Sequence, residues 1–282
     1  MFKVCRFLKN SQPTVGLYLS DAVADLSSLG ISSLAEVLEN PDRLRAVKEA
    51  NLAGEKLSTA KLLLPPVEKQ EVWAAGVTYL RSKKARMDES EFSASAYDRV
   101  YEAARPEIFF KSIGDKVSGP DGPIGIRADA KWNVPEPELA LVINSRKELV
   151  GFTVGNDMSS RDIEGENLLY LPQAKVYKHS CALGPCIVLG ASEQEVRLWD
   201  IAIHIFRDGK DVFSGKTSVS QIKRSFRELI DYLCRSQEFP NGAILLTGTG
   251  IVPNDDFTLS PGDRVRINIS GIGSIENTVV EV

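Results

Sequence analysis

The feature that most constrains this chain is the segment WNVPEPELALVI at residues 132–143. Its second half is continuously apolar, which is typical of a buried β-strand. Successive side chains of a strand point to opposite faces, so Glu136 and Glu138 project from the same side. Each glutamate follows a proline, which has no N–H to give to a neighbouring strand. This end of the strand is therefore expected at a sheet edge, a rim or a bulge.

Two carboxylates held side by side repel each other unless a cation or a proton lies between them. A third carboxylate, Asp157, ends the strand-like stretch GFTVGND at residues 151–157. Glu136, Glu138 and Asp157 together offer three oxygen ligands, which suit Mg²⁺, with Mn²⁺ or Ca²⁺ as alternatives. The spacing alone equally fits three solvated surface charges, because Glu-x-Glu is a common pattern.

The 282 residues suffice for one large domain or for a main domain with a small one. A formal net charge of −4 and an isoelectric point near 5.5 argue against a nucleic acid or an anionic membrane as partner. No apolar run is long enough to span a membrane. The N-terminus MFKVCRFLKN has no secretion signal. We therefore expect a cytoplasmic protein.

A zinc site built from cysteine and histidine is not expected. The four cysteines form no C-x-x-C pair, and the only histidines are His179 and His204. His204 alternates with isoleucines in a strand-like stretch, as a structural residue does. Cys181 and Cys186 are interpreted as small buried thiols in a reducing compartment, with a disulfide or a nucleophile as the less favoured alternative.

The first 65 residues predict a small α+β domain. The stretches KVCRFL and TVGLYL are typical of a hairpin, with residues 10–13 between its strands. Ser33 begins a capping box for one short helix, and Asn40 with Pro41 begins a second. Two prolines in LLLPPVEKQ interrupt the pattern, so the domain boundary is placed between residues 65 and 66.

Residues 66–282 are predicted to form a strand-rich domain. The clearest helix is QIKRSFRELIDYLCRS at residues 221–236, capped by Ser220, with an apolar stripe that covers a sheet. Strand signals outnumber helices after residue 106, which favours antiparallel or mixed sheets and a β-rich α+β fold. The predicted strands are IFF, ELALVI, GFTVGND, PCIVL, IAIHIFRD, AILLTGTG, RVRINI and ENTVVEV.

Six motifs follow one another along the chain: VWAAGVTY (72–79), RPEIFFKS (105–112), PEPELALVI (135–143), GNDMSSRD (155–162), LPQAKVYKHSCALGP (171–185) and LTGTGIV (246–252). In this order they resemble the fumarylacetoacetate hydrolase family, over residues 70–282. The resemblance implies a mixed β-sandwich roll with a small N-terminal α+β domain. It also implies that Glu136, Glu138 and Asp157 bind a divalent metal, with Mg²⁺ as the expected ion.

The same resemblance implies roles for further residues. Lys175 in LPQAKVY corresponds to the family's lysine near the metal, where a cation assists proton transfer or stabilises negative charge. Thr249 in TGTG corresponds to a threonine that meets the keto-acid end of the substrate. Phe109 is implied as pocket wall, Lys111 as a ligand contact and Tyr79 as a further substrate-binding residue.

The hydrolases of the family carry a histidine shortly after the position of Tyr79, and with a glutamate it activates water for C–C cleavage. Here Tyr79 is followed by LRSKKARMDE, which contains no histidine. The segment RDIEGENLLYLPQ (161–173) instead resembles a dehydratase branch of the family. That resemblance implies Mg-dependent loss of water from a 2-keto-3-deoxy sugar acid, of arabinonate or xylonate type, to give 2,5-dioxopentanoate.

Glu164, Glu166 and Lys175 are the candidate catalytic groups, as base or as leaving-group acid, and the sequence leaves their roles open. The alternative is another enzyme of the family, such as an acylpyruvate C–C hydrolase, an oxaloacetate decarboxylase or a keto–enol isomerase. A non-catalytic ligand-binding relative is less favoured, because the three carboxylates and Lys175 are intact.

Two expectations concern features outside the pocket. Residues 80–104 are rich in charge and have only a thin apolar stripe. They are expected to form a mobile lid over the small α-keto acid substrate, or else a permanently packed surface helix. The resemblance also implies a homodimer or a dimer-based homo-oligomer, since strand-rich sheets leave edges that a partner can cover.

Overall fold

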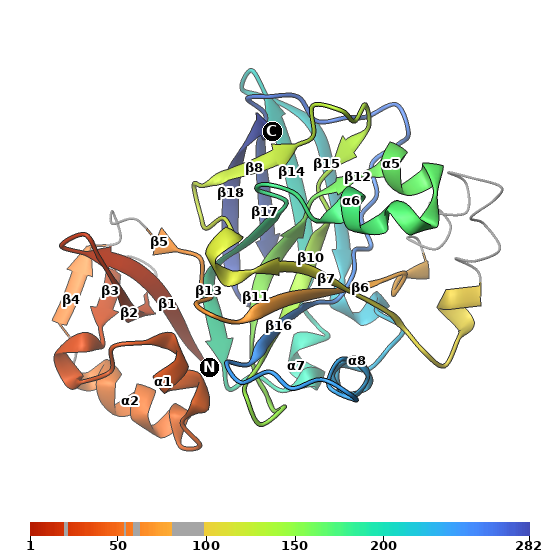
Figure 1. Ribbon diagram of the computed structural model, residues 1–282. Helices are drawn as coiled ribbons and strands as arrows, with labels where there is room; N and C mark the ends of the chain where they lie inside the picture. Colours follow the sequence, from red (N-terminus) through yellow and green to blue (C-terminus); the bar gives the residue numbers. More distant parts are fainter. Residues whose placement is uncertain (20–21, 54, 59–62, 81–98) are drawn as a thin grey trace.

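The computed structural model describes residues 1–19, 22–53, 55–58, 63–80 and 99–282 (Figure 1). Within these residues the strands form one sheet of eleven, one of five and one of two. This architecture confirms the β-rich α+β expectation, with both parallel and antiparallel pairs. None of the helices in the described part has the length and apolar character needed to cross a lipid bilayer.

Every strand predicted from the sequence is present. The strands are β1 (Phe2–Lys9), β2 (Gln12–Tyr18), β3 (Ala22–Asp25), β4 (Glu55–Ser58), β5 (Leu63–Leu64), β6 (Glu71–Gly76), β7 (Glu107–Ile113), β8 (Pro123–Ile126), β9 (Asn133–Val134), β10 (Pro137–Ile143), β11 (Leu149–Asp157), β12 (Ser159–Ser160), β13 (Cys181–Leu189), β14 (Asp200–Arg207), β15 (Lys210–Ser218), β16 (Ala243–Leu246), β17 (Arg264–Ile269) and β18 (Gly273–Glu281).

The helices are short and lie between these strands. The α-helices are α1 (Leu34–Glu39), α2 (Arg43–Ala53), α5 (Arg161–Glu166), α6 (Leu171–Lys175), α7 (Glu193–Val196) and α8 (Phe226–Leu233). The 3₁₀-helices are η1 (Ser27–Leu29), η2 (Gly114–Lys116), η3 (Leu168–Tyr170) and η4 (Val219–Gln221).

The large sheet has the strand order β4-β3-β2-β1-β13-β11-β10-β16-β6-β7, with β5 beside β1, and the five-stranded sheet has the order β15-β14-β17-β18-β8. Strand β10 is buried on both faces, which explains its continuous apolar run. Leu139 belongs to the core that includes Ile203 of the five-stranded sheet. Ala140 faces the other way, into a second core that includes Leu34 of α1. Glu138 shares the face of Ala140 because side chains two residues apart lie on one side.

The predicted N-terminal hairpin is confirmed. Asn10 and Ser11 have φ values of 51° and 63°, as in the two-residue turn that hairpins prefer, and they join β1 to β2. Strand β1 also pairs with β13, so the N-terminal strands continue the large sheet. The domain boundary between residues 65 and 66 stays a prediction, and it falls between two strands of this sheet, β5 and β6.

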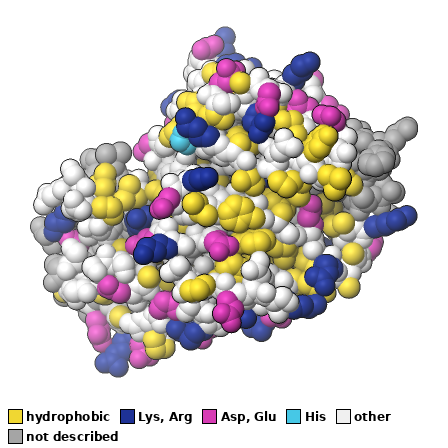
Figure 2. Space-filling model, viewed as in Figure 1, with side chains coloured by type: hydrophobic (Ala, Val, Ile, Leu, Met, Phe, Trp, Pro, Cys, Tyr) yellow, Lys and Arg dark blue, Asp and Glu magenta, His cyan; other side chains and the backbone are white. Residues whose placement is uncertain are grey.

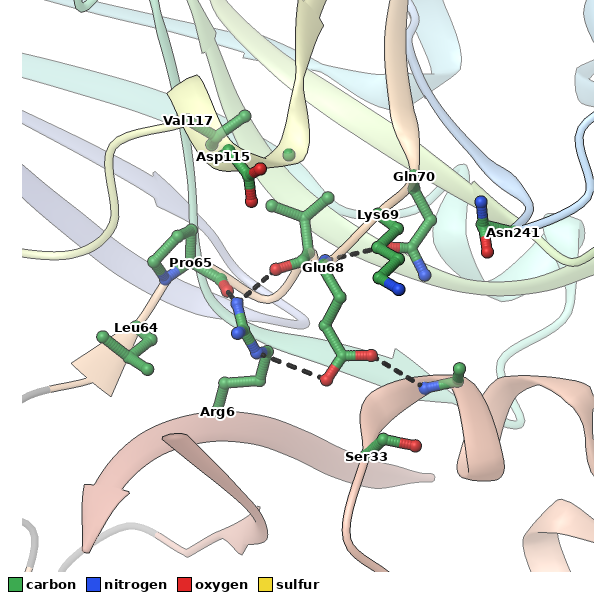
Figure 3. Close-up of a pocket in the computed structure, with 13 residues that line it drawn as sticks. Arg6, Ser33, Leu64, Pro65, Glu68, Lys69, Gln70, Asp115, Val117 and Asn241 are labelled. Carbon is green, nitrogen blue, oxygen red and sulfur yellow. Dashed lines mark hydrogen bonds and ion pairs between the residues drawn. The ribbon is translucent and has the colours of Figure 1, made fainter. Parts of the chain in front are cut away.

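Glu68 ties the N-terminal region to the rest of the molecule (Figure 3). Its carboxylate accepts hydrogen bonds from the backbone N–H groups of Leu34 (3.0 Å) and Ala35 (3.2 Å) at the start of α1. It also lies 3.6 Å from Nε of Arg6 on β1, and Arg6 donates to the carbonyl oxygen of Pro65 at 3.0 Å. The Glu68 side chain thereby holds the start of α1 and strand β1 next to the segment that leads into β6.

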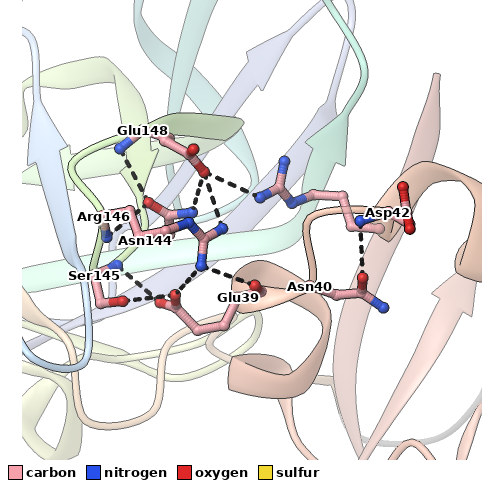
Figure 4. Close-up of polar contacts among 8 residues, drawn as sticks. Glu39, Asn40, Asp42, Asn144, Ser145, Arg146 and Glu148 are labelled. Atoms are coloured by element: carbon pink, nitrogen blue, oxygen red, sulfur yellow. Dashed lines mark hydrogen bonds and ion pairs between the residues drawn. The ribbon is translucent and has the colours of Figure 1, made fainter.

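A second group of polar contacts lies at the other end of α1 (Figure 4). The carboxylate of Glu39 accepts hydrogen bonds from the N–H (2.8 Å) and Oγ (2.7 Å) of Ser145 in the β10–β11 turn. Arg146 approaches the same carboxylate at 3.2 Å. The turn between the two central strands is therefore fastened to the N-terminal helix.

The structure corrects the start of the helix predicted at residues 221–236. Helix α8 begins at Phe226, and its cap is Ser225 rather than Ser220, because the N–H of Glu228 donates to Ser225 Oγ at 3.1 Å. The preceding backbone is used elsewhere: Ile222 bridges to Tyr79, and the N–H of Lys223 donates to the carbonyl oxygen of Thr78. Those contacts hold residues 222–223 out of the helix.

Two other helix expectations come out differently. Ser33 caps α1 as predicted, but the expected capping box is incomplete, because Glu36 accepts from the N–H of Ser32 and not of Ser33. Helix α2 begins at Arg43, and Asn40 Oδ1 accepts from the N–H of Asp42 at 2.8 Å. Most of the expected lid at residues 80–104 lies outside the described residues. Within its described end, residues 99–102 are helical. The lid therefore remains a prediction.

Strand β7 ends the large sheet, so its outer edge has no strand partner among the residues described. Phe110 and Ile113 on β7 are 37% and 42% exposed. Figure 2 shows hydrophobic side chains gathered in the middle of this face of the molecule. An exposed apolar sheet edge is a surface that a partner chain can cover.

The cap assignment predicts a difference between two nearby serines. Ser225→Ala should lower the free energy of unfolding by about 1 kcal/mol, because the N–H of Glu228 loses its acceptor. Ser220→Ala is the matched control, since Ser220 lies before the helix and should change stability by less than about half that amount. Denaturant titration of both variants measures the difference. A larger loss for Ser220→Ala would contradict the assignment.

Candidate active site

The strand register brings the three predicted metal ligands together. Strands β10 and β11 are antiparallel, with Pro137 opposite Asn156 and Glu138 opposite Gly155. The N–H of Asp157 donates to the carbonyl oxygen of Glu136 at 3.0 Å, so Asp157 lies opposite Glu136. Opposite residues of an antiparallel pair share a face. One carboxylate oxygen from each of the three acids lies within 4.8 Å of the others, and all three are buried.

The proline-rich end of β10 is a rim and not an outer edge. Strand β16 pairs with β10 only from Ala140 onward, while β11 flanks the other side. The loop after β16 passes the unpaired end, where the N–H of Gly248 donates to Glu138 Oε2 at 2.6 Å. Gly248 has a φ of 88°, and a side chain there would meet Thr78. The glycine therefore permits this close backbone approach.

Buried cations surround the carboxylates. Nζ of Lys175, at the end of α6, lies 2.7 Å from Glu136 Oε2 and 3.1 Å from Asp157 Oδ2. Arg161, the first residue of α5, approaches Glu136 Oε1 at 3.2 Å. Lys175 and Arg161 are each only 1% exposed. Such burial of charge is tolerated where opposite charges and hydrogen bonds compensate it.

Lys111 lies behind this cluster and not in the pocket wall. Its Nζ is 2.5 Å from Asp157 Oδ1 and donates to the carbonyl oxygens of Met158 (2.9 Å) and Lys175. The side chain is completely buried. Its predicted contact with a ligand stays a prediction, and the contacts described here are all with protein groups.

A small pocket opens beside the carboxylates. It brings together seven of the predicted site residues, and the walls come from β6, β7, β10, β11, α5, α6 and the loop after β16. The lining residues are Ala75, Gly76, Val77, Glu107, Phe109, Glu136, Glu138, Asp157, Glu164, Lys175, Gly248 and Thr249.

Glu107 and Gly76 are lining residues that the sequence reasoning missed. They are cross-strand partners on β7 and β6. A β-carbon at Gly76 would lie 1.9 Å from Glu107 Oε2, so only glycine lets this carboxylate lie across β6 toward the pocket. The sequence signal for this position was the glycine that ends the strand VWAAG. The next residue, Val77, has a φ of 52° in the structure.

Glu164, Glu166 and Tyr79 differ in their position relative to the pocket. Glu164 is buried in the pocket wall and accepts a hydrogen bond from Ser159 Oγ at 3.1 Å. Glu166, at the end of the same helix, is exposed and does not line the pocket. Tyr79 is 1% exposed and also lies outside the lining, and its hydroxyl has no hydrogen-bond partner among the described residues. Burial and the nearby charge of Glu138 raise the pKa of Tyr79.

The electrostatics of the cluster fit a divalent cation. Burial, Asp157 and Glu136 raise the pKa of Glu138 well above its usual range, although Lys175 and the N–H of Gly248 oppose the shift. Oδ1 of Asp157 is buried and forms an ion pair with Nζ of Lys111 at 2.5 Å, but it accepts no hydrogen bond of good geometry from the part of the chain that the structure describes. Three crowded carboxylates, one with such an oxygen, form the hard oxygen donor set that Mg²⁺ prefers.

Neither histidine lies in the pocket wall. His179 follows α6 and lies 3.5 Å, by its Nδ1, from Ser118 Oγ. His204 is exposed on β14, where its Nδ1 lies 2.7 Å from Asp211 Oδ2. The chain has no other histidine. No imidazole is therefore placed to activate water at the carboxylate cluster.

Residues 71–280 match the family described as fumarylacetoacetate (FAA) hydrolase, C-terminal. This match covers well over half of the chain and coincides with the strands and helices that build the site. The chain belongs to the fumarylacetoacetate hydrolase family.

Two relatives that match almost the whole chain are named dehydratases. "Probable 2-keto-3-deoxyxylonate dehydratase" of Haloferax volcanii is 42% identical over 283 residues, covering 98% of this chain and 96% of the relative. "2-dehydro-3-deoxy-D-arabinonate dehydratase" of Saccharolobus solfataricus is 35% identical over 288 residues, covering 98% and 95%. A solved structure named "2-keto-3-deoxy-D-arabinonate dehydratase complexed with magnesium and 2,5-dioxopentanoate" has 31% identity, 99% coverage of both chains and a TM-score of 0.85. The expected fold of the family is thereby confirmed.

The raised pKa of Glu138 predicts how the metal-free protein responds to pH. Folding raises this pKa, so the folded state holds the proton more tightly than the unfolded chain. The free energy of unfolding should therefore fall as pH rises from about 4.3, the usual glutamic acid pKa, toward the folded-state pKa. In chelator, Glu138→Gln should remove this loss and become progressively more stable than the wild type over that range.

Thermal unfolding at several pH values measures the difference, with exposed Glu166→Gln as the matched control. Added Mg²⁺ should raise the midpoint of the wild type and not that of Glu138→Gln, because the variant lacks one charged ligand. A stability difference that does not change with pH would contradict the assignment.

Proposed function

We propose that this chain is a metal-dependent dehydratase that converts a 2-keto-3-deoxy sugar acid, of arabinonate or xylonate type, to 2,5-dioxopentanoate. The observation that carries the proposal is the buried cluster of Glu136, Glu138 and Asp157 beside Lys175, in a chain that resembles named dehydratases over 98% of its length. A relative's structure bears magnesium and 2,5-dioxopentanoate in its name, which supports both the metal and the product.

Glu136, Glu138 and Asp157 would hold the cation, Mg²⁺ by preference, with Mn²⁺ or Ca²⁺ as alternatives. When bound, the ion polarises the ketone of the α-keto acid and thereby acidifies the adjacent methylene. Lys175 keeps its ammonium against two of the three carboxylates, where it stabilises negative charge developing on the substrate.

The dehydration needs one group to take a proton from the methylene and one to give a proton to the departing hydroxyl. Lys175 on α6 and Glu164 on α5 both line the pocket. Glu164 is held by Ser159, which leaves its carboxylate in one orientation. We favour these two over exposed Glu166 for the two proton transfers, with their division left to kinetics.

The remaining pocket residues orient the substrate and exclude water. Phe109 forms one wall, and its ring centroid lies 5.9 Å from Nζ of Lys175. Thr249 follows Gly248 in the loop beside Glu138, where it would meet the keto-acid end of the substrate. Buried Tyr79 would support this loop, because a β-carbon at Gly250 would lie 2.5 Å from its ring. After the hydroxyl leaves C4, a proton taken from C5 and one returned to C3 give an enol, which tautomerises to the aldehyde, and no step requires a water nucleophile.

Two further expectations are kept as part of the proposal. The protein is expected to work in the cytoplasm as a homodimer or a dimer-based homo-oligomer, for which the apolar edge of β7 is a suitable contact surface. Light scattering should give a mass of at least twice 30.9 kDa. A stable monomer at micromolar concentration would contradict the assembly.

The function is tested by a turnover panel. Formation of 2,5-dioxopentanoate should be observed from 2-keto-3-deoxyarabinonate, 2-keto-3-deoxyxylonate or both, and it should stop in chelator and return with Mg²⁺. Cleavage of acylpyruvates, decarboxylation of oxaloacetate and keto–enol exchange are measured in parallel. Faster turnover of any of these would replace the dehydratase proposal with that activity.

The two glutamates of α5 provide a matched pair of variants. Glu164→Gln should lower kcat by about 100-fold or more, the usual range for loss of a proton-transferring group. Glu166→Gln makes the same chemical change at an exposed position of the same helix and should alter kcat less than about twofold. Equal losses in the two variants would contradict the role proposed for Glu164.

A further inference from the structure

We propose that Lys111 is a positioning residue that fixes Lys175 against the acidic cluster, and that it does not touch the substrate. The kinetic part of this proposal rests on the proposed function. Its structural part concerns only contacts among this chain's own residues.

All the hydrogens of the Lys111 ammonium have protein neighbours. Nζ donates to the carbonyl oxygens of Met158 and Lys175, and it lies 2.5 Å from Asp157 Oδ1. A lysine ammonium has three N–H donors and no acceptor. Because the side chain is also fully buried, no donor is left to reach the pocket.

These contacts form a closed ring around Lys175. Lys111 holds the carbonyl oxygen of Lys175 directly, and it holds Asp157, whose other oxygen accepts from Nζ of Lys175 at 3.1 Å. Both ends of the Lys175 residue are therefore connected to one ammonium group. The two oxygens of Asp157 are divided between the two lysines, which fixes the plane of that carboxylate.

Lys175 needs such support because its helix is short. Helix α6 has five residues, so its last carbonyl groups lack partners within the helix. Lys111 supplies a donor and a positive charge to the final carbonyl, which is the favourable sign at a helix C-terminus. A lysine side chain is otherwise flexible, and a fixed backbone limits the positions that its ammonium can reach.

The geometry also separates this role from metal binding. Lys111 brings a positive charge to Asp157, and a positive charge does not attract a divalent cation. Removing it takes away both a repulsion on the cation and one restraint on Asp157, and these effects on magnesium binding have opposite signs. We therefore expect magnesium binding to change little, whereas Lys175 should lose its fixed position. A residue that only stabilised the fold would lower the yield of folded protein without changing the activity of each folded molecule.

The test is Lys111→Met, which keeps the length of the side chain and removes the ammonium. We expect kcat for 2,5-dioxopentanoate formation to fall 10- to 100-fold, the usual loss when a group that orients a site residue is removed. KM for the sugar acid and the Kd for Mg²⁺ by calorimetry should each stay within about threefold of the wild type. Lys116→Met, at an exposed lysine five residues away, is the matched control and should change none of these values.

Three results would overturn the proposal. A rise in KM with unchanged kcat would make Lys111 a substrate contact. Recovery of full activity in excess Mg²⁺ would make it a residue for metal loading only. Unchanged kcat for each folded molecule, with a lower thermal midpoint, would leave it a purely structural role.

Two further measurements keep the proposal testable if Lys111→Met folds poorly or if the proposed function is wrong. Lys111→Arg retains the charge but not the compact set of three contacts, so it should also lower kcat with KM unchanged. A crystal structure of either variant should show Nζ of Lys175 no longer within hydrogen-bond distance of both Glu136 and Asp157. Retention of both contacts would overturn the positioning role, whatever reaction the wild type catalyses.

Discussion

The site depends on one interaction, the mutual repulsion of three carboxylates that the backbone ladder holds together. Strand pairing between β10 and β11 sets Asp157 opposite Glu136, and the pleat sets Glu138 on the same face. Because the strands are in the middle of a large sheet, the acids cannot move apart without breaking ladder hydrogen bonds. The ammonium of Lys175 and the N–H of Gly248 partly offset this repulsion.

The local pattern of apolar residues predicted the strands well. The ends of β10 and α8 depend on pairing with distant parts of the chain, which the sequence does not show. The run after Glu138 is apolar at every position because both faces of β10 are covered, so its strand character was readable. The sequence could not show whether the proline-rich end of β10 lies at a sheet edge or at a rim. That depends on where β16, more than a hundred residues further along the chain, stops pairing with β10. Likewise, the helix predicted from residue 221 begins later because the backbone of Lys223 bonds to Thr78, a contact invisible to helical periodicity.

The same division applies to the site. Strand geometry predicted that Glu136 and Glu138 share a face, but their spacing equally fitted solvated surface charges, and the family resemblance was needed to predict that Asp157 joins them. The roles of Glu164 and Glu166 could not be separated from type and order alone. On a helix, residues two apart do not share a face, and α5 accordingly buries one and exposes the other. Lys111 and Phe109 are two apart on β7, where regular strand geometry predicts a shared face, but the register shift between the pairs Trp73–Phe110 and Val72–Ser112 leaves Lys111 without a partner on β6. Its predicted ligand contact therefore depends on a local irregularity that the sequence does not show.

Charge balance explains how a pocket walled by carboxylates can receive a carboxylate substrate. The fully buried charged groups at the site are four acids and three bases: Glu136, Glu138, Asp157 and Glu164 against Lys111, Arg161 and Lys175. With all seven of these groups ionised, their net charge is −1. This excess negative charge agrees with the raised pKa of Glu138. A divalent cation would offset this excess together with the charge of Glu107, which also lines the pocket, so a monoanionic α-keto acid would no longer meet a negatively charged site. In a low-dielectric interior this difference is large, so electrostatics favour an order in which the cation enters first and the sugar acid second.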